Sequence, residues 1–249
     1  MQHVIKPEYL YIHIPFCKSI CTYCDFIRKI GCSKEIECYV NKIIDELNNK
    51  YKDYSFKTIY IGGGTPNSLN DIILDKLLFT CSKLLQQKYE FTIECNPEFV
   101  NQKQIDIFKK NKVNRISLGI QSTNNKTLKE IGRKYTIEEA KKAIDLFYLN
   151  NINNVSIDFM YGFGNDTTQD IKNDFDFIVN NNIKHYSFYS LELKEGSIMT
   201  KQHKKLNDNL IDSLLEKVIL LSKQYNYKRY EVSNFAISEQ YESLHNKAY

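Results

Sequence analysis

Hydrophobic and polar residues follow two different periods along the chain. Short segments with apolar residues at alternate positions, rich in β-branched and aromatic side chains, predict strands at residues 9–14, 56–61, 89–95, 115–121, 154–160, 184–191 and 227–232. Longer segments with apolar residues three and four positions apart predict helices at residues 35–50, 70–87, 101–110, 124–131, 136–150, 168–181 and 206–225. Thr136 is placed to cap the helix that it begins. Because strands and helices alternate through short connections, the pattern predicts parallel βαβ units and an α/β fold.

Unusual polar and glycine residues fall where the predicted strands end. In chain order they are Cys17, Cys21 and Cys24, then Gly62–Gly64, then Glu94, Gln121 and Asp158. In barrel-like α/β folds the carboxyl ends of the parallel strands hold the active site. Each feature has a simpler interpretation: the glycines as a flexible turn, Glu94 as a solvated charge, and Asp158 as a buried, paired acid. Their occurrence together at one predicted rim favours a functional site.

The three cysteines have the spacing C-x3-C-x2-C. Closely spaced thiolates in a reduced protein suit zinc or an iron–sulfur cluster. Both kinds of centre usually take four protein ligands. Three thiolates therefore leave one metal position open to a small molecule, whereas a structural zinc site would need completion by Cys32, Cys38 or His13.

Composition and charge restrict the class of protein. The chain has 249 residues, 42% of them hydrophobic, which is enough for one large α/β domain. The net charge of +4 is spread along the chain without blocks of like charge, which argues against nucleic-acid binding. No apolar run is long enough to span a membrane, and residues 1–7 contain no signal-peptide core. Seven cysteines, an odd number with three close together, favour a reducing, cytoplasmic setting.

The cysteine spacing and the strand before it resemble the signature of the radical S-adenosylmethionine (SAM) superfamily. Further segments resemble one branch of it, the oxygen-independent coproporphyrinogen III oxidase and heme chaperone HemW family. These segments are Tyr11–Cys17, Ile61–Pro66, Glu94–Pro97, Arg115–Ser122, Ile131–Arg133, Ser156–Gly162, Tyr230–Ala236 and His245–Tyr249. The resemblance covers essentially the whole chain and implies a partial (β/α)6 barrel.

The resemblance also implies a set of ligands. Cys17, Cys21 and Cys24 would bind a [4Fe–4S] cluster, and SAM would chelate the fourth iron. The implied cofactor-binding residues are Tyr11 beside SAM and the cluster and Gly63, Gly64 and Thr65 at the methionine part. Glu94, Gln121, Arg133 and Asp158 would complete the SAM pocket through hydrogen bonds and charge pairing. SAM carries a sulfonium, an ammonium, a carboxylate and a ribose diol, so acids, amides and an arginine suit it. An electron from the reduced cluster would then cleave SAM.

Two features of the sequence resemble the heme chaperone more than the oxidase. The oxidase typically has a fourth cysteine two residues after the third, where this chain has Phe26. The ending resembles the opening of a heme-linked chaperone motif and implies that His245 is an axial heme ligand, with a plain surface histidine as the alternative. The expected partners are heme or a porphyrin, an electron donor and a heme-acceptor protein. The alternative function is oxidative decarboxylation of coproporphyrinogen III.

The predicted domains are a radical SAM core at residues 1–232 and the start of a truncated C-terminal region at residues 233–249. Members of the family continue for roughly another hundred residues, a domain of ordinary size. The heme-linked motif continues with tryptophan directly after Tyr249, and the chain has no tryptophan where average usage predicts about two or three. We therefore expect that the gene reads UGA as tryptophan and that the sequence stops at the first such codon. A UAA or UAG codon after Tyr249 would contradict this expectation.

Overall fold

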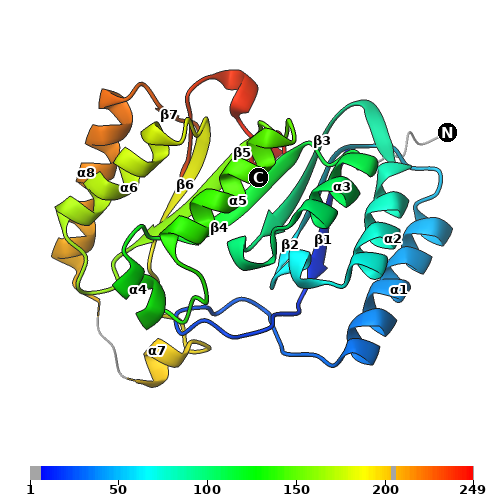
Figure 1. The fold of residues 1–249 in the computed structure, drawn as a ribbon, viewed down its shortest axis with the longest axis horizontal. Coiled ribbons are helices and arrows are strands. Elements are labelled where there is room, and N and C mark those ends of the chain that lie inside the picture. The colour runs from blue at the N-terminus through cyan, green and yellow to red at the C-terminus, as the bar shows by residue number, and fades with distance from the viewer. Residues whose placement is uncertain (1–6, 203–205, 249) are drawn as a thin grey trace, which may run out of the picture.

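The computed structural model describes residues 7–202 and 206–248, and it confirms an α/β fold built on one mostly parallel sheet (Figure 1). The strands are β1 (Tyr9–Ile14), β2 (Phe56–Gly63), β3 (Leu85–Cys95), β4 (Arg115–Gln121), β5 (Val155–Tyr161), β6 (His185–Ser190), β7 (Lys228–Arg229) and β8 (Asn234–Ala236). The helices are α1 (Ser33–Lys50), α2 (Asp71–Ser82), α3 (Gln102–Lys110), α4 (Asn125–Glu130), α5 (Ile137–Leu149), α6 (Thr168–Asn180), α7 (Ile198–Lys201) and α8 (Asp208–Gln224).

The sheet is open and has the strand order β1-β2-β3-β4-β5-β6-β8-β7. Strands β1 to β6 are parallel, and β8 is antiparallel to both of its neighbours. Because β1 and β7 are the two edges and do not pair, the sheet is the incomplete barrel that the sequence predicts. The predicted domain bounds also include residues 1–6 and 249, which lie outside the described residues.

The two faces of the sheet differ in polarity. Successive residues of a strand point to opposite faces. One face is apolar and packs against helices, as the stacking of Phe175 in α6 on Phe188 in β6 shows, with ring centres 5.8 Å apart. The other face carries polar residues, among them Thr58, Tyr60, Glu90, Glu94, Arg115, Ser117, Asp158, His185 and Ser187. The hydrophobic core therefore lies between sheet and helices, and the inside of the partial barrel is polar.

The predicted helix over residues 70–87 is too long. Helix α2 ends at Ser82, and β3 begins at Leu85. Leu85 pairs with Phe56 of β2, and the Phe56 N–H donates to the carbonyl of Leu84 at 2.7 Å. Pairing with a strand distant in sequence decides this boundary, and the local pattern of apolar residues does not contain that information.

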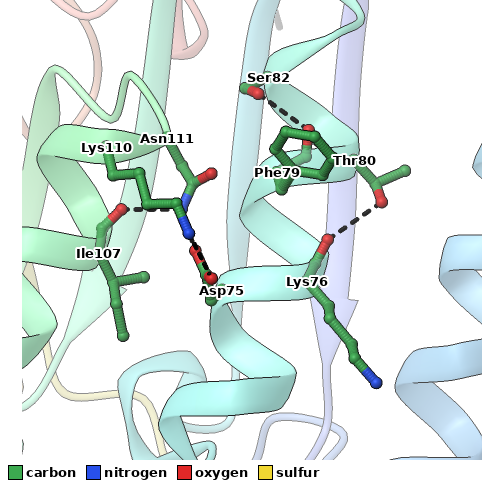
Figure 2. Close-up of polar contacts among 8 residues, drawn as sticks. All are labelled: Asp75, Lys76, Phe79, Thr80, Ser82, Ile107, Lys110 and Asn111. Atoms are coloured by element: carbon green, nitrogen blue, oxygen red, sulfur yellow. Dashed lines mark hydrogen bonds and ion pairs between the residues drawn. The ribbon is translucent and has the colours of Figure 1, made fainter.

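The last turns of α2 and the contact of α2 with α3 are drawn in Figure 2. The hydroxyls of Thr80 and Ser82 donate to the backbone carbonyls of Lys76 (3.0 Å) and Phe79 (2.8 Å), and Phe79 belongs to the last turn of the helix. The carboxylate of Asp75 accepts hydrogen bonds from Lys110 Nζ and Asn111 Nδ2, each at 2.7 Å. These two bonds lower the pKa of Asp75 below its ordinary value. Asn111 also donates to the carbonyl of Ile107 (2.9 Å), so one acid joins α2 to the end of α3.

The predicted strand over residues 227–232 is only partly correct. Strand β7 covers two residues, and the chain then turns into β8, which the sequence did not predict. The carboxylate of Glu231 accepts hydrogen bonds from the Ser233 N–H (3.2 Å) and from Asn234 Nδ2, and these close the turn. The short helix α7 was not predicted either.

Helix α5 begins with a capping box, which confirms Thr136 as the predicted cap. Thr136 Oγ1 accepts from the Glu139 N–H (3.3 Å), and Glu139 Oε2 accepts from the Thr136 N–H (2.7 Å). We expect Thr136→Ala to lower the free energy of unfolding by about 1 kcal/mol, because one N–H at the helix start loses its acceptor. Urea unfolding would measure this, with Thr136→Ser as the control that keeps the hydroxyl. An alanine variant as stable as the unchanged protein would contradict the assignment.

The cysteine loop and the C-terminal segment lie at opposite ends of the sheet. In Figure 1 the loop that follows β1 (blue) crosses below the carboxyl ends of the parallel strands, near α4 and α7. The segment after β8 (red) lies at the other end, where the strands begin. The structure therefore separates two groups of residues for which the sequence predicted one connected function.

Candidate functional site

The loop after β1 brings the three cysteines into a pocket at the carboxyl ends of the strands. The pocket has a volume of about 460 Å³, and all three cysteines line it. The Cys17 N–H donates to the carbonyl of Lys29 (3.0 Å), and the Thr22 N–H donates to the carbonyl of Ile131 (3.0 Å). Backbone hydrogen bonds thus hold the loop in place at two points.

The cysteines suit an iron–sulfur cluster better than a single metal ion. All three are free thiols of intermediate burial. Among the residues that the structure describes, no three His, Cys, Asp or Glu side chains could hold one metal ion together. In a cluster each thiolate can bind a separate iron, so the sulfurs need not meet at one point. Burial raises the pKa of Cys17 and of Cys24, so cluster binding is expected to release protons.

The residues that would complete a zinc site do not join the cysteines. Cys32 and Cys38 are exposed, and neither lines the pocket. His13 Nε2 lies 2.8 Å from the carbonyl oxygen of Ile27 and makes a hydrogen bond there. The structural zinc interpretation therefore lacks a fourth ligand among these candidates.

The turn after β2 packs its backbone against the cysteine loop. The Gly64 N–H donates to the carbonyl of Ile14 (2.8 Å), and the Thr65 hydroxyl donates to Cys17 Sγ (3.6 Å). A Cβ on Gly64 would lie 2.7 Å from the carbonyl oxygen of Phe16. Gly63 has a φ of +119°, which residues with a side chain rarely adopt. The close approach requires these glycines, so the simpler interpretation as a flexible turn is wrong.

Glu94 lies in the pocket with its carboxylate bound on both oxygens. Oε1 accepts from the Tyr60 hydroxyl (2.9 Å), and Oε2 accepts from the Gly63 N–H (2.9 Å). Burial raises the pKa of Glu94 to about 7 despite these two bonds, and the charge of Asp158 raises it as well. A buried carboxylate with a raised pKa in a pocket is a candidate for binding a cationic group.

Asp158 and Gln121 line the same pocket. Asp158 Oδ2 accepts from the Ser117 hydroxyl (2.9 Å), whereas Oδ1 is buried and has no hydrogen-bond partner in the described part of the chain. Burial raises the pKa of Asp158. Gln121 has a φ of +73°, a rare conformation for a residue other than glycine. An unpaired buried acceptor beside a strained residue indicates a site for a ligand that donates hydrogen bonds.

Arg133 is one of several cationic residues that line the pocket. Its Nη1 donates to Asn96 Oδ1 (2.9 Å), and its Nη2 donates to the Tyr23 hydroxyl (2.5 Å). The guanidinium carbon lies 5.8 Å from the centre of the Tyr23 ring and 5.9 Å from that of Tyr135, which is within range of a cation–π contact. The side chain is thus fixed from three sides, and its charge lowers the pKa of the Cys17 thiol against the larger effect of burial.

Two of the predicted site residues, Tyr11 and His245, do not line the pocket. Tyr11 is 45% exposed, and its hydroxyl makes a hydrogen bond with His13 Nδ1 (3.0 Å). His245 is only 4% exposed and lies at the far end of the sheet, where its Nδ1 makes a hydrogen bond with Thr58 Oγ1 (2.7 Å). His245 is therefore not a surface histidine. The ligand roles of both residues stay predictions.

The sequence analysis missed further residues that line the pocket, among them Tyr23, Tyr60, Asn96 and Tyr189. Tyr23 lies between two of the cysteines. Tyr60 is two positions before Gly62, so the alternation within β2 places Tyr60 and Gly62 on the same face of the sheet. Asn96 follows Glu94 and Cys95 at the end of β3. These signals were present, but only the pocket shows which of the neighbouring polar side chains turn inward.

The fold and the site together define a class of protein: an open α/β barrel with a thiol-lined pocket at the carboxyl ends of its parallel strands. The profile of the Radical SAM superfamily matches residues 11–178. The chain belongs to the radical SAM superfamily.

The relatives name a more specific group. The chain is 33% identical to the heme chaperone HemW of Lactococcus lactis over 98% of its own length, and 31% identical to HemW of Bacillus subtilis over 96%. In both cases the chain spans 66% of the relative's length. The structure of coproporphyrinogen III oxidase (HemN) from Escherichia coli superposes on 92% of this chain and 55% of that chain with a TM-score of 0.82. At 19% identity this likeness concerns the fold alone.

No helix within residues 7–202 and 206–248 is both long enough and apolar enough to cross a bilayer.

Proposed function

We propose that this chain is the radical SAM core of a heme chaperone, which binds heme and transfers it to an acceptor protein. The observation that supports it most directly is the match to HemW proteins over nearly the whole chain, combined with a pocket that gathers the three cysteines, Glu94 and Arg133. The proposed core is residues 1–232, and residues 233–249 begin the heme-binding region. The free thiols fit a reducing compartment, for which we propose the cytoplasm.

Cys17, Cys21 and Cys24 would bind a [4Fe–4S] cluster, and the remaining pocket would bind SAM. When bound, the cluster and SAM supply one-electron chemistry. Glu94 would pair with the ammonium of SAM, and Arg133 would pair with its carboxylate. Asp158 and Gln121 would accept and donate hydrogen bonds to the ribose hydroxyls, because both line the same pocket. The backbone of Gly63 and Gly64 and the hydroxyl of Thr65 would face the methionine part, and Tyr11 would close this side from β1.

His245 would supply an imidazole to the heme iron. In the described conformation its ring is buried, so this ligation requires the C-terminal segment to leave its place on the sheet. An electron donor for the cluster and a protein that accepts heme complete the proposed set of partners.

The alternative is an oxygen-independent coproporphyrinogen III oxidase, which the fold likeness to HemN permits. Phe26, which lines the pocket where the oxidase typically has a fourth cysteine, favours the chaperone. Anaerobic incubation of the reconstituted protein with reductant, SAM and coproporphyrinogen III separates the two. We expect unchanged coproporphyrinogen by mass spectrometry. Loss of two carboxyl groups would make the oxidase the correct function.

Heme titration tests the chaperone assignment. We expect His245→Ala to weaken heme binding about tenfold or more, since the axial ligand is lost. His13→Ala is the matched control, because His13 is a second histidine, lies on β1 and makes a hydrogen bond with the backbone carbonyl of Ile27. Equal heme affinity of the two variants would remove His245 from the proposed site.

A further inference from the structure

One side chain touches both the cofactor pocket and the buried His245. Tyr60 lies on the polar face of β2 and donates its hydroxyl to Glu94 Oε1 at 2.9 Å. Its ring stacks on the ring of His245, with centres 4.9 Å apart and planes inclined by 26°. Tyr60 also lines the pocket. It therefore joins the two regions that the fold holds apart.

The segment that carries His245 is held by one acid of the barrel interior. Glu90, on β3, accepts hydrogen bonds from the Ser243 hydroxyl (2.7 Å), the Leu244 N–H (2.8 Å) and the His245 N–H (3.1 Å). Thr58, two residues before Tyr60 on β2, makes a hydrogen bond with the His245 ring. The position of His245 thus depends on residues of β2 and β3, the strands that also carry Tyr60 and Glu94.

We propose that Tyr60 is a positioning residue that couples SAM binding at Glu94 to the buried position of His245. A cation paired with Glu94 keeps this carboxylate charged, and a charged acceptor holds the Tyr60 hydroxyl more strongly than a protonated one. A more firmly held Tyr60 ring favours the stacked, buried position of His245. SAM binding should therefore make His245 less accessible, and heme binding through His245 should be weaker when SAM is bound.

The coupling is reciprocal, because two sites linked by one equilibrium change each other's affinity by the same factor. Release of the C-terminal segment should therefore weaken SAM binding. Coupling between two ligand sites requires a contiguous set of contacts whose arrangement both ligands can shift. The contacts from Glu94 through Tyr60 to His245 form such a set. This inference rests on the proposed function, since it takes SAM as the ligand of Glu94 and heme as the ligand of His245.

The test measures the reactivity of His245 toward diethyl pyrocarbonate, located by mass spectrometry, in the cluster-reconstituted protein with and without saturating SAM. We expect SAM to slow the modification roughly fivefold or more, which is the lower end of typical coupling between sites. Tyr60→Phe keeps the ring stack but loses the hydroxyl, so SAM should change its His245 reactivity little or not at all. Tyr189→Phe is the matched control, because it removes another phenol from the pocket and should retain the SAM effect.

A second variant tests the coupling from the other end. Glu90→Gln changes no residue of the pocket but weakens the bonds to the C-terminal segment. We expect faster modification of His245 and a raised SAM dissociation constant, by at most the factor by which SAM protects His245. If SAM binds but His245 reactivity does not depend on it, the coupling is wrong and the proposed function stands. If SAM does not bind to the unchanged protein, both the coupling and the proposed function are wrong.

Discussion

Replacement of Cys24 by serine is expected to remove the iron–sulfur cluster. Four cysteines line the pocket among the described residues, and the fourth, Cys95, is buried in the hydrophobic core, so we expect that it does not take the place of Cys24. A serine hydroxyl is a hard ligand and stays protonated near neutral pH, so it does not replace a thiolate toward iron. Removing a partner of a metal ligand already costs about 10- to 100-fold in affinity, and we expect loss of a ligand itself to cost at least about 100-fold.

The measurement is iron and acid-labile sulfide per chain after anaerobic reconstitution. Cys32→Ser is the control, because Cys32 is exposed, lies at the start of α1 and does not line the pocket. It should retain the full cluster. Serine variants of Cys17 and Cys21 should behave like Cys24→Ser. A cluster that persists in Cys24→Ser but is lost in Cys32→Ser would overturn the assignment of the three ligands.

The position of the pocket could be predicted from the sequence because many of its residues come from local patterns. Gly63, Glu94 and Gln121 lie at the end of a strand or one residue before it, and alternation of apolar residues identifies these strands, whereas Asp158 lies in the middle of β5. Parallel strands bring their carboxyl ends to one rim of the sheet, so residues that were predicted strand by strand come together in one site. The structure then placed all four of these residues on one pocket.

The polar interior of the barrel could not be predicted in the same way. Arg115 is only 1% exposed, and its guanidinium contacts His185, which is 70 residues later in the chain (Nη2 to Nδ1, 3.3 Å). Burial, followed by the charge of Arg115, holds the pKa of His185 well below its ordinary value. Such a pair depends on the order of strands in the sheet, and the sequence does not state that order.

The position of His245 has the same cause. A polar segment near the end of the chain has no periodic pattern that would place it inside a barrel. The decisive contact is the carboxylate of Glu90, more than 150 residues earlier in the chain, which the backbone N–H groups of Leu244 and His245 reach. Resemblance to a heme-linked motif predicted a chemical role for this histidine, whereas the structure shows a buried ring bonded to Thr58.

Glu94 is expected to make SAM binding depend on pH. Burial raises its pKa to about 7, so below that pH the carboxyl group is mostly protonated and cannot pair with the ammonium of SAM. The affinity for SAM should rise as the pH increases from about 5.5 and level off above about 7.5, by up to about tenfold per pH unit on the acid side. Isothermal titration calorimetry of the reconstituted protein across this range measures the effect. Glu94→Gln should lack this pH dependence and bind SAM about 10- to 100-fold more weakly at pH 7.5, because a charge-assisted hydrogen bond is lost.

The carboxyl group of Glu94 should also make the stability of the fold depend on pH. Stability should fall as the pH rises, whereas the affinity for SAM should increase. The pKa of Glu94 is higher in the folded protein than its ordinary value of 4.5, so between about pH 4.5 and pH 7 the folded state binds more protons than the unfolded state. The free energy of unfolding should therefore fall as the pH rises through this window, by about 3 kcal/mol from this one group.

Glu94→Gln has no charge to bury, so without SAM it should be more stable than the unchanged protein at pH 7.5 and equal to it near pH 4.5. Asp158→Asn is the control that removes the neighbouring acid and leaves Glu94 in place. A Glu94→Gln variant that is less stable than the unchanged protein at pH 7.5 would show that the carboxylate is retained for the fold, whereas greater stability with weaker SAM binding would show that a buried charge is kept there for its ligand.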